Sequence, residues 1–260
     1  MSSHEMPPKM SCIKIHDARD LDGMRKAGQL AAGVLAFIEE HMVEGVSTGE
    51  LDSMCSGFIT AHGATSATLG YQGFPASTCI SVNNVVCHGI PGSYRLKSGD
   101  IVNIDVTIKL NGWHGDTSRT FMIGSCTKLA QTLVEVTEKA MYVGISAVRP
   151  YGYFGDIGKA IQGFVNRHGF SIVRNYCGHG IGTEMHADPM ILHYDSEEPG
   201  PQILPGMFFT IEPMINAGSY KTKLMKDGWT AVTSDKSLSA QFEHTIAVTE
   251  NAVEVLTRSP

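Results

Sequence analysis

The sequence lacks the segments and clusters that mark several common classes of protein. No apolar run in its 260 residues approaches the roughly 20 residues that cross a membrane, and the first twelve residues lack the apolar centre of a signal peptide. The six cysteines contain no C-x-x-C pair, which argues against both a disulfide framework and a structural zinc site. A net charge of −6 without clustered lysine or arginine argues against a nucleic-acid surface.

What remains is an ordinary globular composition. Hydrophobic residues make up 42% of the chain and charged residues 18%. A chain of this size can bury roughly 70–75% of the surface that it exposes when unfolded. We expect residues 1–12 to form a flexible tail and residues 13–260 to form a single domain, in a cytoplasmic protein with reduced thiols.

Helical periodicity predicts two pairs of helices. The first pair comprises Leu21 to Met42 and a segment that begins near Ser47 and ends at Gly63, and the second comprises Lys128–Ala147 and Asp156–Gly169. A shift of 106 residues carries Gly63 onto Gly169 and aligns other positions of the two pairs. The match indicates a faint internal repeat, although chance could also produce it.

Two aspartates lie on the arms of a predicted β-hairpin. Apolar and polar residues alternate from residue 101 to residue 108, and Asn111-Gly112 is a strong signal for a two-residue turn. That turn pairs Thr107 with Asp116 and Asp105 with Ser118, so the two aspartates become diagonal neighbours on one face, within roughly 7–8 Å. Carboxylates this close favour a divalent cation between them, although a solvated polar face is the alternative.

The second half of the chain carries two further acids on predicted strands. Glu212 shares a strand face with Thr210 and precedes Pro213, which ends the strand. Glu243 lies on the polar face of a strand predicted from Ser239 to Ile246. Either acid could be solvated on an edge strand, but two similar halves facing each other would bring four carboxylates to a shared centre.

Three histidines lie in loop-like sequence near glycine. His179 lies in Gly178-His179-Gly180, His186 follows seven residues later, and His88 precedes Gly89. Flanking glycines permit close backbone approach. An imidazole without any ligand role is the more frequent case for a single histidine, whereas three of them favour a catalytic cleft.

An ordered set of motifs resembles the type I methionine aminopeptidases, members of the M24 metallopeptidase family. The similarity extends from about Ile15 to about Leu256, which is nearly the whole chain. It is carried by the segments Val86-Cys87-His88-Gly89-Ile90-Pro91, Asn103-Ile104-Asp105-Val106-Thr107, His114-Gly115-Asp116-Thr117, Gly178-His179-Gly180-Ile181-Gly182, Thr210-Ile211-Glu212-Pro213 and Gln241-Phe242-Glu243-His244-Thr245.

The resemblance implies an α+β pita-bread fold, with pseudo-twofold αβ halves and a curved, mainly antiparallel sheet covered by helices. It also implies two divalent metal ions, with Asp116 and Glu243 bridging both, Asp105 on one, and His179 and Glu212 on the other. Four carboxylates and one imidazole suit Mn²⁺, Fe²⁺, Co²⁺ or catalytic Zn²⁺. Family members can also carry a monovalent cation near carbonyls that match Asn83, Val85 and Ser239.

The resemblance further implies removal of the initiator methionine from nascent polypeptides with a small second residue, by hydroxide that the two metals activate. His88, His186 and Glu212 would be catalytic, with Glu212 as the proton shuttle. The methionine pocket would comprise, together with His88 and His186, Tyr71, Phe74, Cys79, Met185 and Trp229. Core packing is the alternative for the aromatic residues. Met185 and Thr68 stand where the family more often has an aromatic residue and a cysteine, which concerns the shape of the pocket and not the reaction.

Two other functions compete with this expectation. A proline-specific peptidase of the same fold would have similar ligands but usually adds an N-terminal domain, for which this chain has no room. A non-enzymatic relative would typically have lost metal ligands, and all five are present. We expect a monomer whose partners are nascent N-termini and the ribosome, without nucleic-acid or membrane binding.

Overall fold

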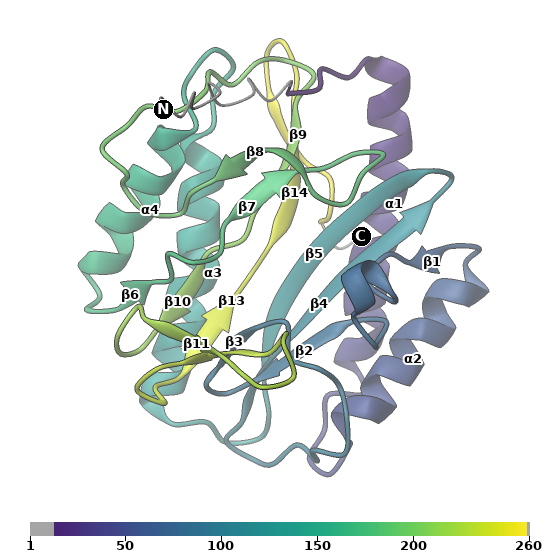
Figure 1. Ribbon diagram of the computed structural model, residues 1–260, viewed down its shortest axis with the longest axis vertical. Helices are drawn as coiled ribbons and strands as arrows, with labels where there is room; N and C mark the ends of the chain where they lie inside the picture. Colours follow the sequence, from purple (N-terminus) through teal and green to yellow (C-terminus); the bar gives the residue numbers. More distant parts are fainter. Residues whose placement is uncertain (1–12, 259–260) are drawn as a thin grey trace, which may run out of the picture.

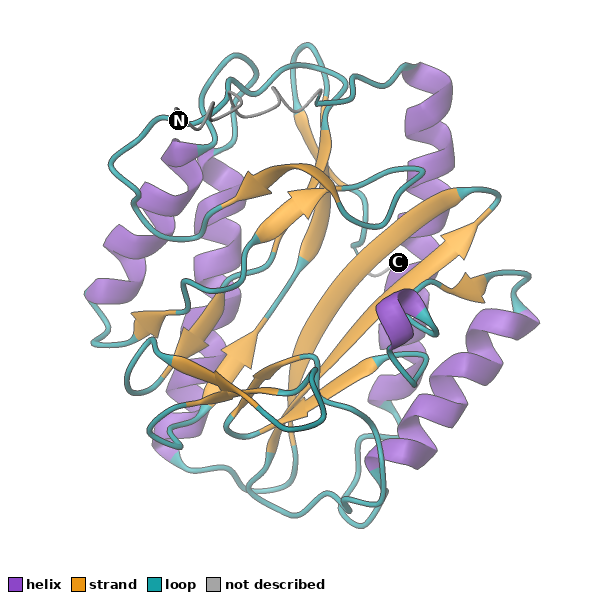
Figure 2. Cartoon of the chain, viewed as in Figure 1, coloured by secondary structure: helices purple, strands orange, loops and turns teal. Residues whose placement is uncertain are grey.

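The computed structural model describes residues 13–258. Figure 1 shows helices α1 and α2 together on one side of the molecule, helices α3 and α4 on the other, and the strands between them. The α+β class expected from the sequence is confirmed, as the separation of helices and strands in Figure 2 also shows. The predicted tail at residues 1–12 lies outside the described residues, and the assignment of residues 13–260 to one domain stays a prediction.

The first two helices begin at the caps that their sequences provide. α1 (Ala18–Glu39) begins after Asp17, whose carboxylate accepts hydrogen bonds from the first turn in a capping box. α2 (Thr48–Ala61) begins after Ser47, which forms a capping box with Glu50 as the sequence predicts. α1 begins and ends three residues earlier than predicted, because the cap at Asp17 and not the apolar pattern fixes its start.

The second pair of helices repeats the first. α3 (Lys128–Ala147) has the predicted bounds, and α4 is Gly155–Asn166. A shift of 106 residues would carry α2 to residues 154–167, which agrees with α4 to within one residue at each end. Each pair packs on the strands of its own half through a separate apolar core. No helix among residues 13–258 combines the length and apolarity that a membrane crossing requires.

The predicted hairpin has the predicted register. β4 (Ile101–Leu110) pairs with β5 (Trp113–Met122), with Thr107 opposite Asp116 and Asp105 opposite Ser118. The turn residues Asn111 and Gly112 have φ values of 50° and 89°, the positive angles that a type I′ turn requires. β1 (Thr65–Ser66) and β2 (Cys79–Val82) also pair with β4 and complete this sheet.

Three further sheets complete the fold, and all their pairings are antiparallel. The largest has five strands in the order β15-β14-β9-β7-β8, all from the second half of the chain. Two three-stranded sheets have the orders β13-β10-β6 and β11-β12-β3, and a 3-10 turn, η1 (Tyr71–Gly73), precedes β2. The remaining strands are β3 (Val85–Cys87), β6 (Ser171–Ile172), β7 (Gly178–Gly180), β8 (Ala187–Ile191), β9 (Phe208–Ile211), β10 (Met214–Asn216), β11 (Thr222–Leu224), β12 (Ala231–Thr233), β13 (Ser239–Gln241), β14 (His244–Val248) and β15 (Val253–Val255).

One strand prediction is wrong in a way that bears on the site. The strand expected from Ser239 to Ile246 is divided, because β13 pairs with β10 whereas β14 pairs with β9 in another sheet. Glu243 lies in the gap, and its backbone N–H donates to the carbonyl of Ser118 on β5 at 3.0 Å. Through this hydrogen bond to β5, the two halves of the molecule meet at Glu243.

Candidate metal centre

All five predicted metal ligands line one cavity of about 340 Å³. The hairpin of the first half contributes the two aspartates. The histidine comes from β7, and the two glutamates come from the end of β9 and from the gap between β13 and β14. The halves thus supply ligands to a common centre, as the repeat predicted. The five residues are Asp105, Asp116, His179, Glu212 and Glu243.

The side chains converge closely within this cavity. Asp116, His179 and Glu243 each offer one ligand atom, and the three atoms lie within 4.8 Å of one another. The Nε2 atom of His179 is 3.6 Å from Asp116 Oδ2 and 3.5 Å from Glu212 Oε1. The charge of Asp105 is close enough to raise the pKa of Asp116.

Hydrogen bonds across the junction hold the acidic strands in place. The Thr117 hydroxyl donates to the carbonyl of Glu243 at 2.7 Å, and the Thr245 hydroxyl donates to the carbonyl of Asp116 at 2.7 Å. Each half therefore binds the backbone of the ligand that the other half supplies. This reciprocal bonding explains why Asp116 and Glu243 face each other across the halves.

The glycines around His179 allow close packing of three strands. A Cβ atom on Gly178 would lie 2.5 Å from the carbonyl oxygen of Thr210, and one on Gly180 would lie 2.1 Å from that of Asp188. The Nδ1 atom of His179 donates to the carbonyl of Gly180 at 3.1 Å, which leaves Nε2 as the ligand atom. The glycine spacing noted in the sequence thus reflects backbone approach on both sides of the imidazole.

The electrostatics of the cluster fit a bound cation. Burial, followed by mutual repulsion, raises the pKa values of Asp116 and Glu243 well above the usual range, and burial raises that of Asp105 to about 7. Within residues 13–258, no lysine or arginine forms an ion pair with the four acids. Oxygen and imidazole donors without a thiolate suit a divalent metal such as Mn²⁺, Fe²⁺, Co²⁺ or Zn²⁺.

The family model of metallopeptidase family M24 matches residues 22–250. The chain belongs to metallopeptidase family M24. It is 54% identical to the methionine aminopeptidase of Rickettsia prowazekii over 95% of this chain and 96% of that protein. It is 53% identical to the methionine aminopeptidase of Escherichia coli K12 over 94% of each chain. The similarity to type I methionine aminopeptidases predicted from the motifs is confirmed.

Solved structures of M24 proteins have the same fold. The crystal structure of the Rickettsia prowazekii methionine aminopeptidase superposes with a TM-score of 0.94, at 53% identity, and covers 95% of this chain and 100% of that one. The Thermotoga maritima methionine aminopeptidase gives a TM-score of 0.93, at 36% identity, with the same coverage. These superpositions confirm the predicted pita-bread fold.

The predicted substrate residues line the same cavity as the five predicted metal ligands. Phe74 and Trp229 contact each other edge to face, with ring centroids 5.2 Å apart. His88 follows β3 and adopts a positive φ of 55°. The other lining residues named from the sequence are Thr68, Tyr71, Cys79, Met185 and His186. Their roles in substrate binding stay predictions at this point.

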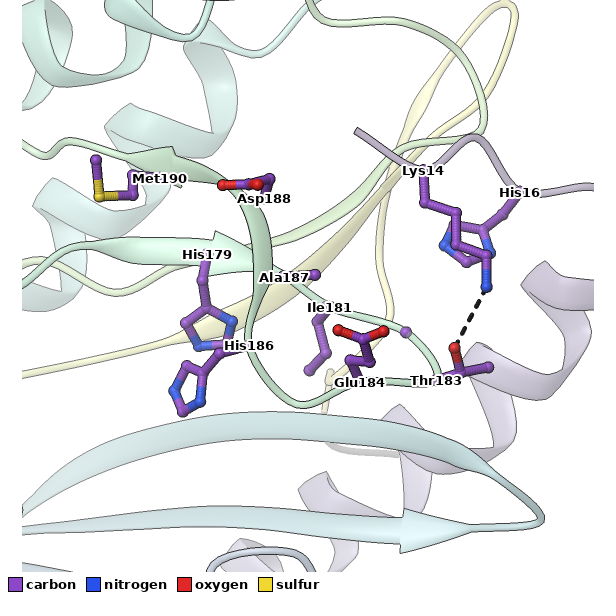
Figure 3. Close-up of a pocket in the computed structure, with 11 residues that line it drawn as sticks. Lys14, His16, His179, Ile181, Thr183, Glu184, His186, Ala187, Asp188 and Met190 are labelled. Atoms are coloured by element: carbon purple, nitrogen blue, oxygen red, sulfur yellow. Dashed lines mark hydrogen bonds between the residues drawn. The ribbon is translucent and has the colours of Figure 1, made fainter. Parts of the chain in front are cut away.

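Beside this cavity lies a wider groove, whose residues Figure 3 shows. The groove has a volume of about 560 Å³ and shares His179 and His186 with the cavity. The two imidazoles lie together with their ring centroids 4.2 Å apart. The groove continues from them past Glu184 and Asp188 toward Lys14. The groove therefore opens directly beside the predicted ligand His179.

Several further side chains form hydrogen bonds with the predicted ligands. The Thr107 hydroxyl donates to Asp116 Oδ1 at 2.8 Å, and the Thr210 hydroxyl donates to Glu212 Oε1 at 2.7 Å. The sequence placed Thr107 opposite Asp116 and Thr210 on the strand face of Glu212, without assigning either threonine a role. His193 accepts a hydrogen bond from the backbone of Glu212, and burial lowers its pKa to about 3. Nothing in the local sequence marks His193.

Metal binding to this M24 centre should release protons. Because the raised pKa values keep part of the acid cluster protonated near pH 7, a divalent cation has to displace those protons. We expect Mn²⁺ affinity to rise between about pH 6 and 8, with on the order of one proton released per protein. Calorimetry in two buffers of different ionisation enthalpy measures this release. Identical heats in both buffers and an affinity that does not change with pH would contradict the prediction.

Proposed function

We propose that the protein removes the N-terminal methionine from nascent polypeptides in a metal-dependent reaction. The observation that carries this proposal is the convergence of four acids, three of them buried, and one imidazole in a cavity that aromatic and sulfur-containing side chains also line. Membership of metallopeptidase family M24 and 54% identity to a methionine aminopeptidase support it.

The metal site would hold two divalent cations. We assign Asp116 and Glu243 to both cations, Asp105 to one, and His179 and Glu212 to the other. Such cations polarise a carbonyl and lower the pKa of water toward roughly 7, which supplies a nucleophile at neutral pH. The protein's part is to hold these ligands deprotonated and fixed, and the threonine hydroxyls beside Asp116 and Glu212 support that role.

The histidines would act as neutral hydrogen-bond donors to the substrate. The Nδ1 atom of His186 lies 2.8 Å from the Tyr71 hydroxyl. If that hydroxyl donates, the proton of His186 is on Nε2, from which it can bond to the scissile carbonyl oxygen. Burial lowers the pKa of His88 to about 4, so His88 also stays neutral at pH 7 beside the scissile amide.

Glu212 is the proposed proton carrier. Its carboxylate accepts hydrogen bonds from Thr210 at 2.7 Å and from the Gln241 amide at 3.3 Å. Burial is the main cause that raises its pKa well above the usual range in the metal-free protein. In the reaction, Glu212 would take a proton from the attacking water and pass it to the leaving amine.

The cavity walls favour an unbranched apolar side chain. Aromatic edges provide favourable contacts for a thioether sulfur, and Tyr71, Phe74 and Trp229 lie around the cavity with Cys79 and Met185. We propose that methionine occupies this space and that the next residue has to be small. A monovalent cation near the carbonyls of Asn83, Val85 and Ser239 remains part of the proposal.

Purified protein reconstituted with Mn²⁺ or Co²⁺ should release methionine from Met-Ala-Ser, as measured by chromatography of the products. Chelation should abolish the release, because no other group in the cavity can supply the nucleophile at neutral pH. Re-addition of metal is the control and should restore activity. Intact Met-Ala-Ser after incubation with the reconstituted protein would contradict the proposal.

The same assay separates the competing functions. The prolidase of Pyrococcus furiosus has the same fold, with a TM-score of 0.76 at 22% identity, which is a likeness of fold alone. Cleavage of Ala-Pro without cleavage of Met-Ala-Ser would favour a proline-specific peptidase. Binding of a peptide without turnover would favour a non-enzymatic protein.

We further propose a cytoplasmic monomer that acts on nascent chains at the ribosome.

A further inference from the structure

The backbone N–H of Glu212 bonds to a side chain and not to a neighbouring strand. β9 ends at Ile211, whose partner on β14 is His244, and β7 is paired with β9 only at Phe209. Proline follows at position 213 and has no N–H to continue the ladder. The Glu212 N–H instead donates to the Nε2 atom of His193 at 3.1 Å.

His193 is held firmly in its position. Its side chain is buried, with 1% exposure, and it lies two residues after the end of β8. The chain on both sides of it packs against α4, because a Cβ atom on Gly158 would lie 2.2 Å from the Tyr194 carbonyl oxygen and 2.8 Å from that of Leu192. The acceptor atom is therefore fixed by backbone packing and not by a flexible loop.

The contact completes a set of hydrogen bonds around one ligand. Thr210 and Gln241 hold the Glu212 carboxylate from the side-chain end, and His193 holds its peptide from the backbone end. Accepting a hydrogen bond at Nε2 requires a neutral ring with its proton on Nδ1. Without that acceptor, a buried N–H would lack a partner, and the peptide would rotate to find one.

We propose that His193 is a positioning residue that fixes the Glu212 peptide and thereby sets the affinity of the centre for its metals. The proposal rests on the proposed function in one respect, namely that Glu212 is a metal ligand. His193 does not line the cavity, so its effect should appear in metal binding before it appears in turnover.

The test compares side chains that can and cannot accept the hydrogen bond. In His193→Gln, the amide oxygen can reach the place of Nε2, whereas His193→Asn is too short and His193→Leu has no acceptor. Calorimetric titration of the metal-free proteins with Mn²⁺ gives the affinities. We expect His193→Gln to bind within about threefold of the unmodified protein, and His193→Asn and His193→Leu to bind about 10–100-fold more weakly.

A matched control tests the loss of a buried imidazole as such. His16 is also buried, stacks on Phe208 and bonds to Asp20. His16→Leu should leave Mn²⁺ affinity unchanged. If His193→Leu does not fold, as judged by circular dichroism, the pair His193→Gln and His193→Asn still decides. Equal affinities for that pair, or Mn²⁺ binding by folded His193→Leu that matches the unmodified protein, would overturn the proposal.

The outcomes also separate this inference from the proposed function. Normal Mn²⁺ binding without any release of methionine from Met-Ala-Ser would remove the proposed function and leave the role of His193 intact. An unmodified protein that bound no Mn²⁺ would overturn both. The predicted ranking of the His193 variants together with methionine release would support both.

Discussion

Asp116→Asn should abolish methionine release while the protein stays folded. Asparagine preserves the volume of the side chain and an oxygen that can accept from Thr107, but it removes the negative charge from the group formed with His179 and Glu243. We expect metal affinity to fall by more than a hundredfold and kcat/KM by about a thousandfold or more, which corresponds to several kcal/mol of lost transition-state stabilisation.

Asp116→Asn should not lower the thermal stability of the metal-free protein, although it lowers metal affinity and activity. Burial is the main cause that raises the pKa of Asp116, and the charge of Asp105 adds to it, so removing the Asp116 charge relieves both the cost of burying it and the repulsion. The metal-free variant should therefore unfold at the same temperature as the unmodified protein or higher, as measured by circular dichroism. Metal affinity and stability would then change in different directions, which simple misfolding cannot produce.

A half-buried acid outside the cavity provides the control for Asp116. Asp52 lies on α2 and accepts hydrogen bonds from the backbone N–H and the hydroxyl of Thr78, both at 2.8 Å. Asp52→Asn keeps an oxygen that can accept both hydrogen bonds from Thr78 and should leave Mn²⁺ affinity and turnover unchanged. Undiminished turnover by Asp116→Asn, or equal loss of metal by both variants, would refute the assignment of Asp116 as a ligand.

The sequence predicted those features whose determinants are local. Asn111 and Gly112 fix the register of the whole hairpin, because a two-residue turn leaves only one way to pair the strands. The positions of Asp105 and Asp116 follow from that register. The start of α2 follows equally from Ser47 and Glu50, whose reciprocal hydrogen bonds satisfy the first turn.

Features that depend on contacts between the halves could not be predicted in this way. Polar and apolar residues alternate around Glu243 in the same way whether the segment forms one continuous strand or two. The segment is divided only because β13 pairs with β10 and β14 pairs with β9 in another sheet. The motif resemblance brought Glu243 to the site without indicating this break. His193 had no signal at all, because its partner Glu212 is 19 residues away, just after the end of β9.

Gly180→Ala should be among the most damaging single substitutions outside the ligands. The new Cβ atom would lie 2.1 Å from the carbonyl oxygen of Asp188 and 2.7 Å from its carbon. Because both are backbone atoms, β7 and β8 would have to separate. We expect a loss of about 3 kcal/mol or more in the free energy of unfolding, which lowers Tm by about 5–10 °C.

Activity should fall further than stability alone requires. Gly180 follows His179 directly, and its carbonyl accepts the hydrogen bond that orients the imidazole. Displacement of a catalytic group by about 1 Å can cost roughly a hundredfold in rate. Below its melting temperature, the folded Gly180→Ala protein should therefore show a loss of this order in kcat/KM for Met-Ala-Ser, together with weaker Mn²⁺ binding.

Gly163 on α4 is the matched control, because a Cβ atom there meets nothing within 4 Å. The backbone at Gly163 is helical, and alanine is favoured over glycine in a helix interior by about 1 kcal/mol. Gly163→Ala should therefore raise Tm by about 2–4 °C with unchanged turnover. Equal effects of the two substitutions would mean that the glycines beside His179 are not required for close packing of β7. The opposite signs expected here arise because the same methyl group meets a backbone carbonyl in one place and solvent in the other.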